Sequence, residues 1–301
     1  MKRVVVILLA LLAFLLLVLL AVYIFALTST DRSAILHSKS SLHHDGYERT
    51  YRVVTSKRYD NSIDYPLVVM LHGYNDRGVQ MQLYSGMSNL GNEKGFISVY
   101  PDGLNRSWNG EFCCGNSWKR NVDDVGFISE MIKRIKKDYS IDASRVFVAG
   151  YSNGGLLTQK LLNDNPEIFA GGAVVMSGIG SDEGSLDIDS SRAPILFING
   201  ENDKYVPLNQ QHESKRGFNF TPADTTLDKW KLAYGCTNNA AEIDEEQYYG
   251  SVYTCEESVI ARYVFKDTAH AWPQWRLSNP FKQIPESSRL IWDFWVDQSG
   301  N

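Results

Sequence analysis

The residues with the clearest chemical potential lie in one short segment, Gly150-Tyr151-Ser152-Asn153-Gly154. It matches the pattern G-x-S-x-G, in which a serine hydroxyl acts as a nucleophile. The pattern alone is weak evidence, because glycine and serine are common, so its setting must decide. Arg145 to Ala149 predicts a strand before the serine, and a helix is predicted to begin near Gly154. This strand–turn–helix setting is the one that a serine nucleophile of this type requires.

A serine hydroxyl needs a base that removes its proton, and the base needs a carboxylate that orients it. With this motif the usual chain order is serine, acid, histidine. Two histidines follow Ser152. His270 comes just after the last apolar strand and is predicted to be the base. His212 lies in a charged segment and is interpreted as a surface residue.

The acid is expected in the loop after the predicted strand 194–198. In mostly parallel sheets, sites form at the carboxyl ends of the strands. Asp203 lies in this loop and is predicted to be the acid, with Glu201 as the alternative. Asp187 and Asp189 precede the strand and therefore fall at the opposite end of the sheet.

The tetrahedral intermediate of such chemistry needs hydrogen-bond donors directed at its oxyanion. The backbone N–H of Asn153, directly after the serine, is one candidate. The N–H of Tyr74, in the loop after the strand ending at His72-Gly73, is the second. His72 itself precedes Ser152 and lies beside a strand end, so a structural hydrogen-bonding role is predicted for it.

The elements that must position these residues alternate between strand and helix. Strands are predicted at 51–55, 65–71, 96–100, 145–150, 172–176 and 194–198, with a pair within 251–265. Helices are predicted at 80–93, 125–139, 156–162, 225–233 and 287–297. Buried apolar strands that alternate with helices predict an α/β fold, with a mostly parallel twisted sheet and helices on both faces.

The N-terminal segment predicts a membrane anchor. Val4 to Leu27 carries no charged residue and, as a helix of about 36 Å, would cross a hydrocarbon core of about 30 Å. A cleaved signal peptide is the alternative, giving a secreted protein. Lys2 and Arg3 favour an orientation in which the rest of the chain lies outside the cytoplasm. We therefore predict an anchor at 1–27, a flexible linker at 28–45 and one catalytic domain at 46–301.

Composition and cysteine spacing exclude some classes of function. The net charge is −5, so the surface is not suited to nucleic-acid binding. None of the Cys and His spacings resembles a zinc site, so no metal is predicted. Cys236 and Cys255 are predicted to form a disulfide that closes a small polar loop. Cys113 and Cys114 are adjacent, and the sequence leaves open whether they bridge, pair elsewhere or stay reduced.

The motifs in this order resemble the polyhydroxybutyrate depolymerase and feruloyl esterase family. The segments that carry the resemblance are Leu71-His72-Gly73-Tyr74, Tyr100-Pro101-Asp102-Gly103, Ser107-Trp108-Asn109-Gly110, Cys113-Cys114-Gly115, Val122-Asp123-Asp124-Val125-Gly126-Phe127, Gly150 to Gly155 and His270-Ala271-Trp272-Pro273. The resemblance covers about residues 47 to 298. It implies an α/β-hydrolase fold and cofactor-free hydrolysis of a small or oligomeric carboxylic ester, with Ser152, Asp203 and His270 as the triad.

Two segments depart from the family pattern. The acid loop begins Asn199-Gly200-Glu201 where the family commonly has His-Gly-Thr, and Thr268 and Ala269 stand where glycines are common. Neither change removes a catalytic group, but both alter the rim of the pocket. Trp108 and Trp272 are candidates for stacking on a substrate, with a packing role as the alternative. A serine peptidase of the same fold and a non-catalytic binding module are the alternative functions.

Overall fold

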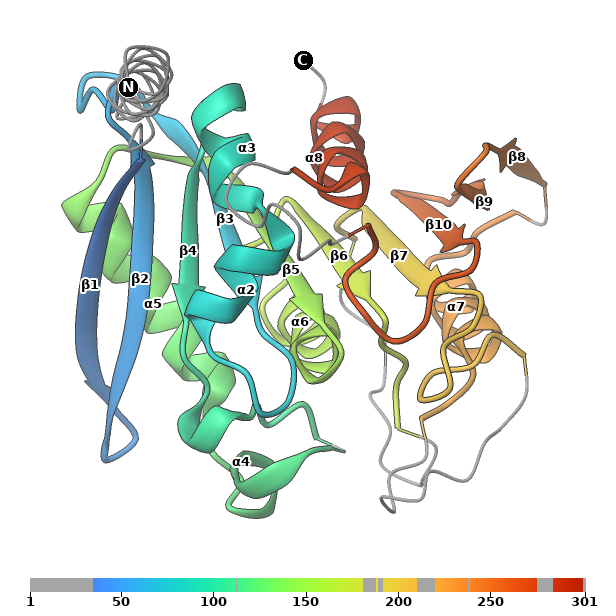
Figure 1. Ribbon diagram of the computed structural model, residues 1–301, viewed down its shortest axis with the longest axis horizontal. Helices are drawn as coiled ribbons and strands as arrows, with labels where there is room; N and C mark the ends of the chain where they lie inside the picture. Colours follow the sequence, from blue (N-terminus) through green and yellow to red (C-terminus); the bar gives the residue numbers. More distant parts are fainter. Residues whose placement is uncertain are drawn as a thin grey trace, which may run out of the picture.

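The computed structural model describes residues 35–111, 113–180, 188, 192–209, 220–237, 239–274 and 284–299 (Figure 1). Its strands are β1 (Ile35–His44), β2 (Tyr47–Ser56), β3 (Tyr65–Leu71), β4 (Ile97–Pro101), β5 (Ile141–Tyr151), β6 (Gly171–Val175), β7 (Ile195–Gly200), β8 (Ala240–Asp244), β9 (Tyr248–Thr254) and β10 (Val259–Phe265). Its helices are α2 (Gly78–Ser85), α3 (Met87–Lys94), α4 (Gly115–Lys119), α5 (Asp124–Asp138), α6 (Asn153–Asp164), α7 (Ala223–Ala233) and α8 (Glu286–Gln298), with a short 3-10 turn, η2 (Leu104–Arg106).

The strands of the described residues form one sheet in the order β1-β2-β4-β3-β5-β6-β7-β10-β9-β8. The central strands from β4 to β10 pair in parallel, and the strands at both edges pair antiparallel. Strands β3, β4, β6 and β7 are buried almost throughout, as expected for strands covered on both faces. The predicted α/β class with a mostly parallel sheet is confirmed.

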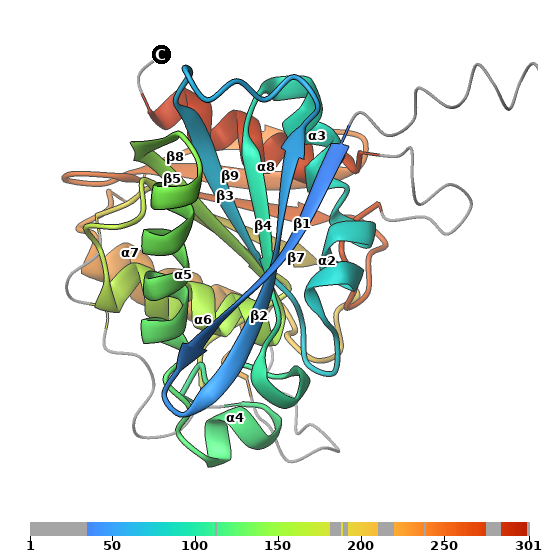
Figure 2. The ribbon, with the colours of Figure 1, turned by 90° about the vertical axis from the view of Figure 1, so that its left-hand side faces the viewer.

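Helices cover both faces of the sheet (Figure 2). Helices α5, α6 and α7 pack on one face, where Phe127, Leu161 and Trp230 enter the core with side chains of the strands. Helices α2, α3 and α8 pack on the other, with Met81, Met87 and Trp292 among its buried residues. The sheet between these two cores is therefore shielded from water, and its rigid strand ends can position a site.

The predicted flexible linker at 28–45 is wrong over Ile35–His44. These residues form β1, which pairs with β2 from end to end, so the folded domain starts before residue 46. The polar sequence of this segment concealed the strand, because an edge strand needs backbone pairing more than apolar side chains. Leu42 supplies one contact with the core, and the exposed side chains His37, Lys39 and His43 are typical of an edge.

Further elements differ from the prediction, and the short helix α4 and the turn η2 were not predicted. The helix predicted over 80–93 is divided into α2 and α3 at Gly86, whose φ of 60° is left-handed and ends the first helix. Strand β8 was not predicted, because its residues are mostly exposed and carry little apolar alternation. The other predicted strands and helices are present, with ends shifted by a few residues.

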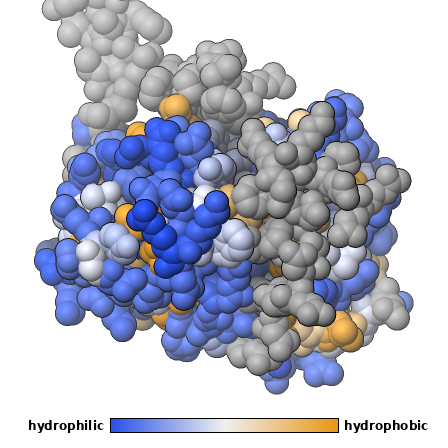
Figure 3. Space-filling view, turned by 90° about the horizontal axis from the view of Figure 1, so that it is seen from below, coloured by the Kyte–Doolittle hydropathy of each residue, from blue (hydrophilic) through white to orange (hydrophobic). Residues whose placement is uncertain are grey.

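The carboxyl ends of the central parallel strands point to the lower face of the molecule in Figure 1. Viewed from that side, the surface is mainly hydrophilic, with hydrophobic residues in small separate spots (Figure 3). Within the described ranges, no helix is long and apolar enough to cross a membrane. The predicted anchor at 1–27 lies outside those ranges.

Candidate active site

Three loops at the carboxyl ends of the strands bring Ser152, His270 and Asp203 together. His270 Nε2 lies 2.9 Å from Ser152 Oγ, and His270 Nδ1 lies 2.8 Å from Asp203 Oδ2. Because Nδ1 faces a carboxylate, it carries the ring proton, and Nε2 is left free to accept the proton of the serine hydroxyl. The three residues predicted to work together thus form one continuous chain of hydrogen bonds.

The serine lies in a sharp turn between β5 and α6. Ser152 has φ 52° and ψ −116°, a conformation that costs energy for any residue with a side chain. Its backbone N–H donates to Val175 O at 2.8 Å, which ties the turn to the neighbouring strand β6. Gly154 is required because a Cβ there would lie 2.3 Å from Leu71 O. The surrounding backbone therefore holds the half-buried Ser152 in the turn at the end of β5.

The carboxylate is held by the loop that follows β7. Asp203 is 4% exposed, and its Oδ1 accepts hydrogen bonds from the backbone N–H groups of Tyr205 and Val206 at 2.8 and 3.0 Å. These two donors satisfy one oxygen and leave Oδ2 for His270. Glu201, the alternative acid, is exposed, and its Oε2 accepts from Asp267 N at 3.1 Å. His212, the alternative base, lies outside the described residues.

The two backbone amides predicted as oxyanion donors lie at the start of α6 and in the turn after β3. Asn153 N is the first N–H of α6, where the helix dipole favours negative charge. Tyr74 N lies in the turn after β3 that is closed by the bond from Asp76 N to Gly73 O. Neither amide donates to another group of the described residues. Both predicted oxyanion donors are thus free to bind a ligand oxygen.

His72 joins two loops at the base of the site. It is fully buried, its Nδ1 donates to Gly73 O at 2.7 Å, and its Nε2 accepts from Gly103 N at 2.9 Å. Burial lowers the pKa of His72 to about 4. The ring is therefore neutral, and the geometry agrees with the structural hydrogen-bonding role predicted for it.

The predicted substrate-stacking role of Trp108 and Trp272 is wrong. Their exposed fractions are 0% and 3%, so neither ring offers a face to a ligand. Trp108 Nε1 donates to His72 O at 2.9 Å, and Trp272 Nε1 donates to Ser288 Oγ at 3.2 Å. Both indoles are packing residues. The positions of Trp108 and Trp272 within their sequence motifs did not reveal which way the rings point.

Tyr205, not the tryptophans, presents an exposed ring near the triad. Tyr205 is 42% exposed, and its ring centroid lies 5.0 Å from that of His270. Tyr74, which also carries one of the two free amides, is 45% exposed. Sequence reasoning missed Tyr205, although its position two residues after the acid was a usable signal.

The loop before α4 is fastened to the serine turn by the side chain of Asn153. Asn153 Oδ1 accepts from Trp108 N at 2.7 Å, and Asn153 Nδ2 donates to Trp108 O and Cys113 O at 3.1 and 2.6 Å. Cys113 and Cys114 form a disulfide with each other, which resolves the pairing that the sequence left open. The predicted disulfide between Cys236 and Cys255 is also present.

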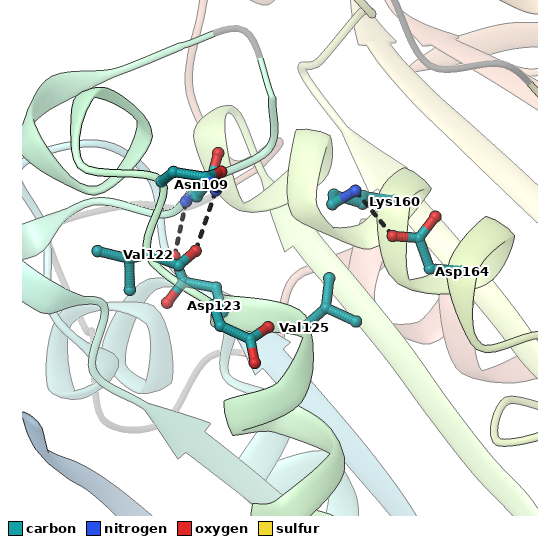
Figure 4. Close-up of a pocket in the computed structure, with 8 residues that line it drawn as sticks. Asn109, Val122, Asp123, Val125, Lys160 and Asp164 are labelled. Carbon is teal, nitrogen blue, oxygen red and sulfur yellow. Dashed lines mark hydrogen bonds and ion pairs between the residues drawn. The ribbon is translucent and has the colours of Figure 1, made fainter. Parts of the chain in front are cut away.

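A separate pocket of about 350 Å³ lies between α5 and α6 (Figure 4). Its lining includes Asn109, Asp123, Lys160 and Asp164. Lys160 pairs with Asp164 at 2.7 Å and with Glu111, so its charge is satisfied within the protein. In the described part of the chain, no cluster of His, Cys, Asp and Glu is suited to a metal ion. We therefore place the candidate site at Ser152 and not in this pocket.

Comparison with known proteins supports the fold and the resemblance. Residues 85–179, which include the serine turn, match the Prolyl oligopeptidase family. The chain is 36% identical over 118 residues to "Poly(3-hydroxyalkanoate) depolymerase C" of Paucimonas lemoignei, covering 38% of this chain and 28% of that protein. It is 29% identical over 206 residues to "Probable feruloyl esterase C" of Aspergillus clavatus, covering 62% of this chain and 70% of that protein.

A solved structure agrees with this relationship at the level of the fold. The acetyl xylan esterase from Aspergillus awamori superposes with a TM-score of 0.58 at 15% identity, covering 78% of this chain and 95% of that one. The strand order and this likeness identify the α/β-hydrolase fold. The resemblance inferred from the motifs is confirmed by the named relatives, although the match spans little more than a quarter of the depolymerase.

Proposed function

We propose that this chain, an α/β-hydrolase related to the polyhydroxyalkanoate depolymerases and feruloyl esterases, is a serine esterase with the catalytic triad Ser152, His270 and Asp203. The observation that carries the proposal is the chain of two hydrogen bonds, 2.9 and 2.8 Å long, that links these residues. A serine in a turn with a paired base and a buried acid is the arrangement that acyl transfer requires.

The proposed reaction uses these hydrogen bonds. Ser152 Oγ attacks the ester carbonyl carbon while His270 Nε2 takes the hydroxyl proton, and the N–H groups of Asn153 and Tyr74 stabilise the oxyanion. The intermediate collapses when His270 returns the proton to the leaving alcohol, which leaves an acyl-enzyme on Ser152. Water then attacks the acyl carbon, gives its proton to His270 and releases the acid, and the serine recovers its proton.

The substrate class comes from the relatives and from the rim of the site. We propose feruloyl or acetyl esters of sugars, or hydroxyalkanoate oligomers, because the named relatives are feruloyl esterases and a polyhydroxyalkanoate depolymerase. The exposed rings of Tyr205 and Tyr74 supply apolar surface for such an acyl group. The departures at Asn199-Gly200-Glu201 and at Thr268-Ala269 alter the same rim, so the choice among these esters needs a direct assay.

A serine peptidase of the same fold is the second candidate. The match of residues 85–179 to the Prolyl oligopeptidase family favours it, and the triad chemistry would be the same. Esters and anilides of the same acid separate the two, because only a peptidase cleaves the anilide at a comparable rate. A non-catalytic binding module is disfavoured because all three triad groups are present and bonded.

The proposal is tested with a fluorophosphonate probe and p-nitrophenyl acetate. The purified protein should label at Ser152 and hydrolyse the ester, and Ser152→Ala should lose both while keeping its circular dichroism spectrum. Methyl ferulate, acetylated xylan oligomers and hydroxybutyrate oligomers then assign the acyl group. A folded wild-type protein that neither labels nor hydrolyses any of these esters would refute the proposed function.

We also propose that residues 1–27 anchor the domain to a membrane with the catalytic domain outside the cytoplasm. The support is the uncharged segment Val4 to Leu27 and the disulfide between Cys236 and Cys255, a bond typical of oxidising compartments. Alkaline carbonate should leave the full-length chain in the membrane fraction. A mature N-terminus near Thr28, found by mass spectrometry, would show instead a cleaved signal and a secreted enzyme.

A further inference from the structure

Tyr151, the residue before the proposed nucleophile, reaches across the site to the loop that carries the proposed base. Its hydroxyl donates a hydrogen bond to the backbone carbonyl of His270 at 2.9 Å. The two residues are 119 positions apart in the chain. The two ring centroids lie 5.4 Å apart. One side chain therefore connects the serine turn directly to the histidine loop, without passing through the triad hydrogen bonds.

We propose that Tyr151 is a positioning residue that holds His270 at proton-transfer distance from Ser152, an inference that rests on the proposed function. The histidine loop is fastened on either side of His270. Thr268 O accepts from Asn202 N at 2.9 Å, and the buried Trp272 bonds to Ser288 through its indole. Between these anchors, Tyr151 is the donor that fixes the backbone of His270 itself.

Tyr151 is itself held in place and stays a donor. Its ring meets that of Tyr84 edge-on at 5.7 Å, and a Cβ on Gly73 would lie only 2.8 Å from its Cδ1. The ring thus packs between the loop after β3 and the histidine loop. Burial, followed by the charge of Asp203, raises the pKa of Tyr151 well above its ordinary value, so the hydroxyl keeps its proton at neutral pH.

The hydroxyl should affect proton transfer more than substrate binding. Bonds through Nδ1 and Nε2 orient the His270 ring but leave it able to move with its loop. A base works only within about 2.6–3.2 Å of the proton's donor atom, so a looser loop lowers the fraction of productive complexes. Because the Tyr151 hydroxyl already donates to a protein carbonyl, its loss should lower kcat and leave KM nearly unchanged.

The test replaces Tyr151 by Phe, which keeps the ring and removes the hydroxyl. With p-nitrophenyl acetate, kcat should fall about 3- to 10-fold, the equivalent of one neutral hydrogen bond, and KM should stay within about twofold. Tyr234→Phe is the matched control, because the Tyr234 hydroxyl donates to Ala193 O at 3.0 Å away from the triad. The control should keep the wild-type kcat. An unchanged kcat in folded Tyr151→Phe, or an equal fall in the control, overturns the proposal.

A double-mutant cycle shows whether the effect passes through His270. In a His270→Ala background, Tyr151→Phe should not lower the residual rate further, since nothing remains to be positioned. The same fold-loss in that background would mean that Tyr151 acts elsewhere and would overturn the proposal. Wild-type protein that is folded but fails to label or turn over would instead refute the esterase function, so the two failures can be distinguished.

Discussion

Replacing Asp203 by Asn tests the triad most directly. The two carboxylate oxygens have different partners, since Oδ2 faces His270 Nδ1 and Oδ1 accepts from the N–H groups of Tyr205 and Val206. Asparagine has nearly the same shape but replaces one acceptor oxygen by an NH₂ donor. The NH₂ group of the asparagine must therefore face either His270 Nδ1 or the two backbone N–H groups.

The structure decides which partner is affected. If the NH₂ faced Tyr205 and Val206, two hydrogen bonds would be lost, at about 0.5–1.5 kcal/mol each, and donors would face donors. The amide oxygen should therefore keep that position and the NH₂ should face His270 Nδ1. His270 must then accept at Nδ1 and carry its proton on Nε2, where it cannot take the proton of Ser152. The expected loss in kcat is about 10⁴-fold, the size of this tautomer effect in another serine triad.

The assay is the steady-state hydrolysis of p-nitrophenyl acetate by purified Asp203→Asn. Thermal unfolding and circular dichroism should match the wild type, because the buried side chain keeps its shape and two of its hydrogen bonds. Glu201→Gln serves as the control, since its side chain bonds Asp267 N and not the histidine. If Asp203→Asn kept near wild-type activity and Glu201→Gln lost it, the acid role would move to Glu201.

Three further predictions concern stability, selectivity and pH. Arg49 is 1% exposed and donates a hydrogen bond to Asp124 at 2.5 Å. Asp124→Ala leaves this buried charge unpaired, so urea titration should show a loss of about 3–5 kcal/mol in unfolding free energy. Tyr205→Ala should lower kcat/KM for methyl ferulate about two- to tenfold more than for an acetyl ester, and an unchanged ratio would contradict an aromatic wall. Because burial lowers the pKa of His72 to about 4, the unfolded chain binds a proton below pH 6.5 that the folded protein excludes. Stability should thus fall by up to about 3 kcal/mol between pH 6.5 and pH 4, less steeply in His72→Gln.

The central sheet and the positions of the candidate site residues at strand ends could be predicted from the sequence, because both depend on local patterns. Buried strands such as Tyr65–Leu71 are continuous apolar runs, which leave little doubt about their burial on both faces. The usual order of serine, acid and histidine then restricted the base to two histidines. The acid is expected after the end of a strand, which favoured Asp203 over the aspartates that precede that strand. The hydrogen bonds between Ser152, His270 and Asp203 have the geometry that this reasoning anticipated.

Predictions failed where tertiary contacts outweighed local pattern. β1 is polar and still forms a strand, because β2 supplies its backbone partners along ten residues. Trp108 and Trp272 stand beside motif residues in the sequence, but each indole N–H finds its acceptor in the interior, so both rings are buried. Tyr205 is exposed, although its own backbone N–H donates to the buried Asp203. The periodicity of apolar residues in the sequence does not show such tertiary contacts.

The side chain of Asn153 connects two parts of the site that the sequence left separate. The loop from Trp108 to Cys113 lies about 45 residues before Asn153, and no rule of chain order relates the two. Three hydrogen bonds to the backbone of that loop fix the side chain of Asn153. The backbone N–H of the same residue is the proposed oxyanion donor. A shift of the loop is therefore transmitted to the donor through one residue. These hydrogen bonds join the segments around Trp108 and Cys113 and the serine motif into one unit beside the proposed nucleophile.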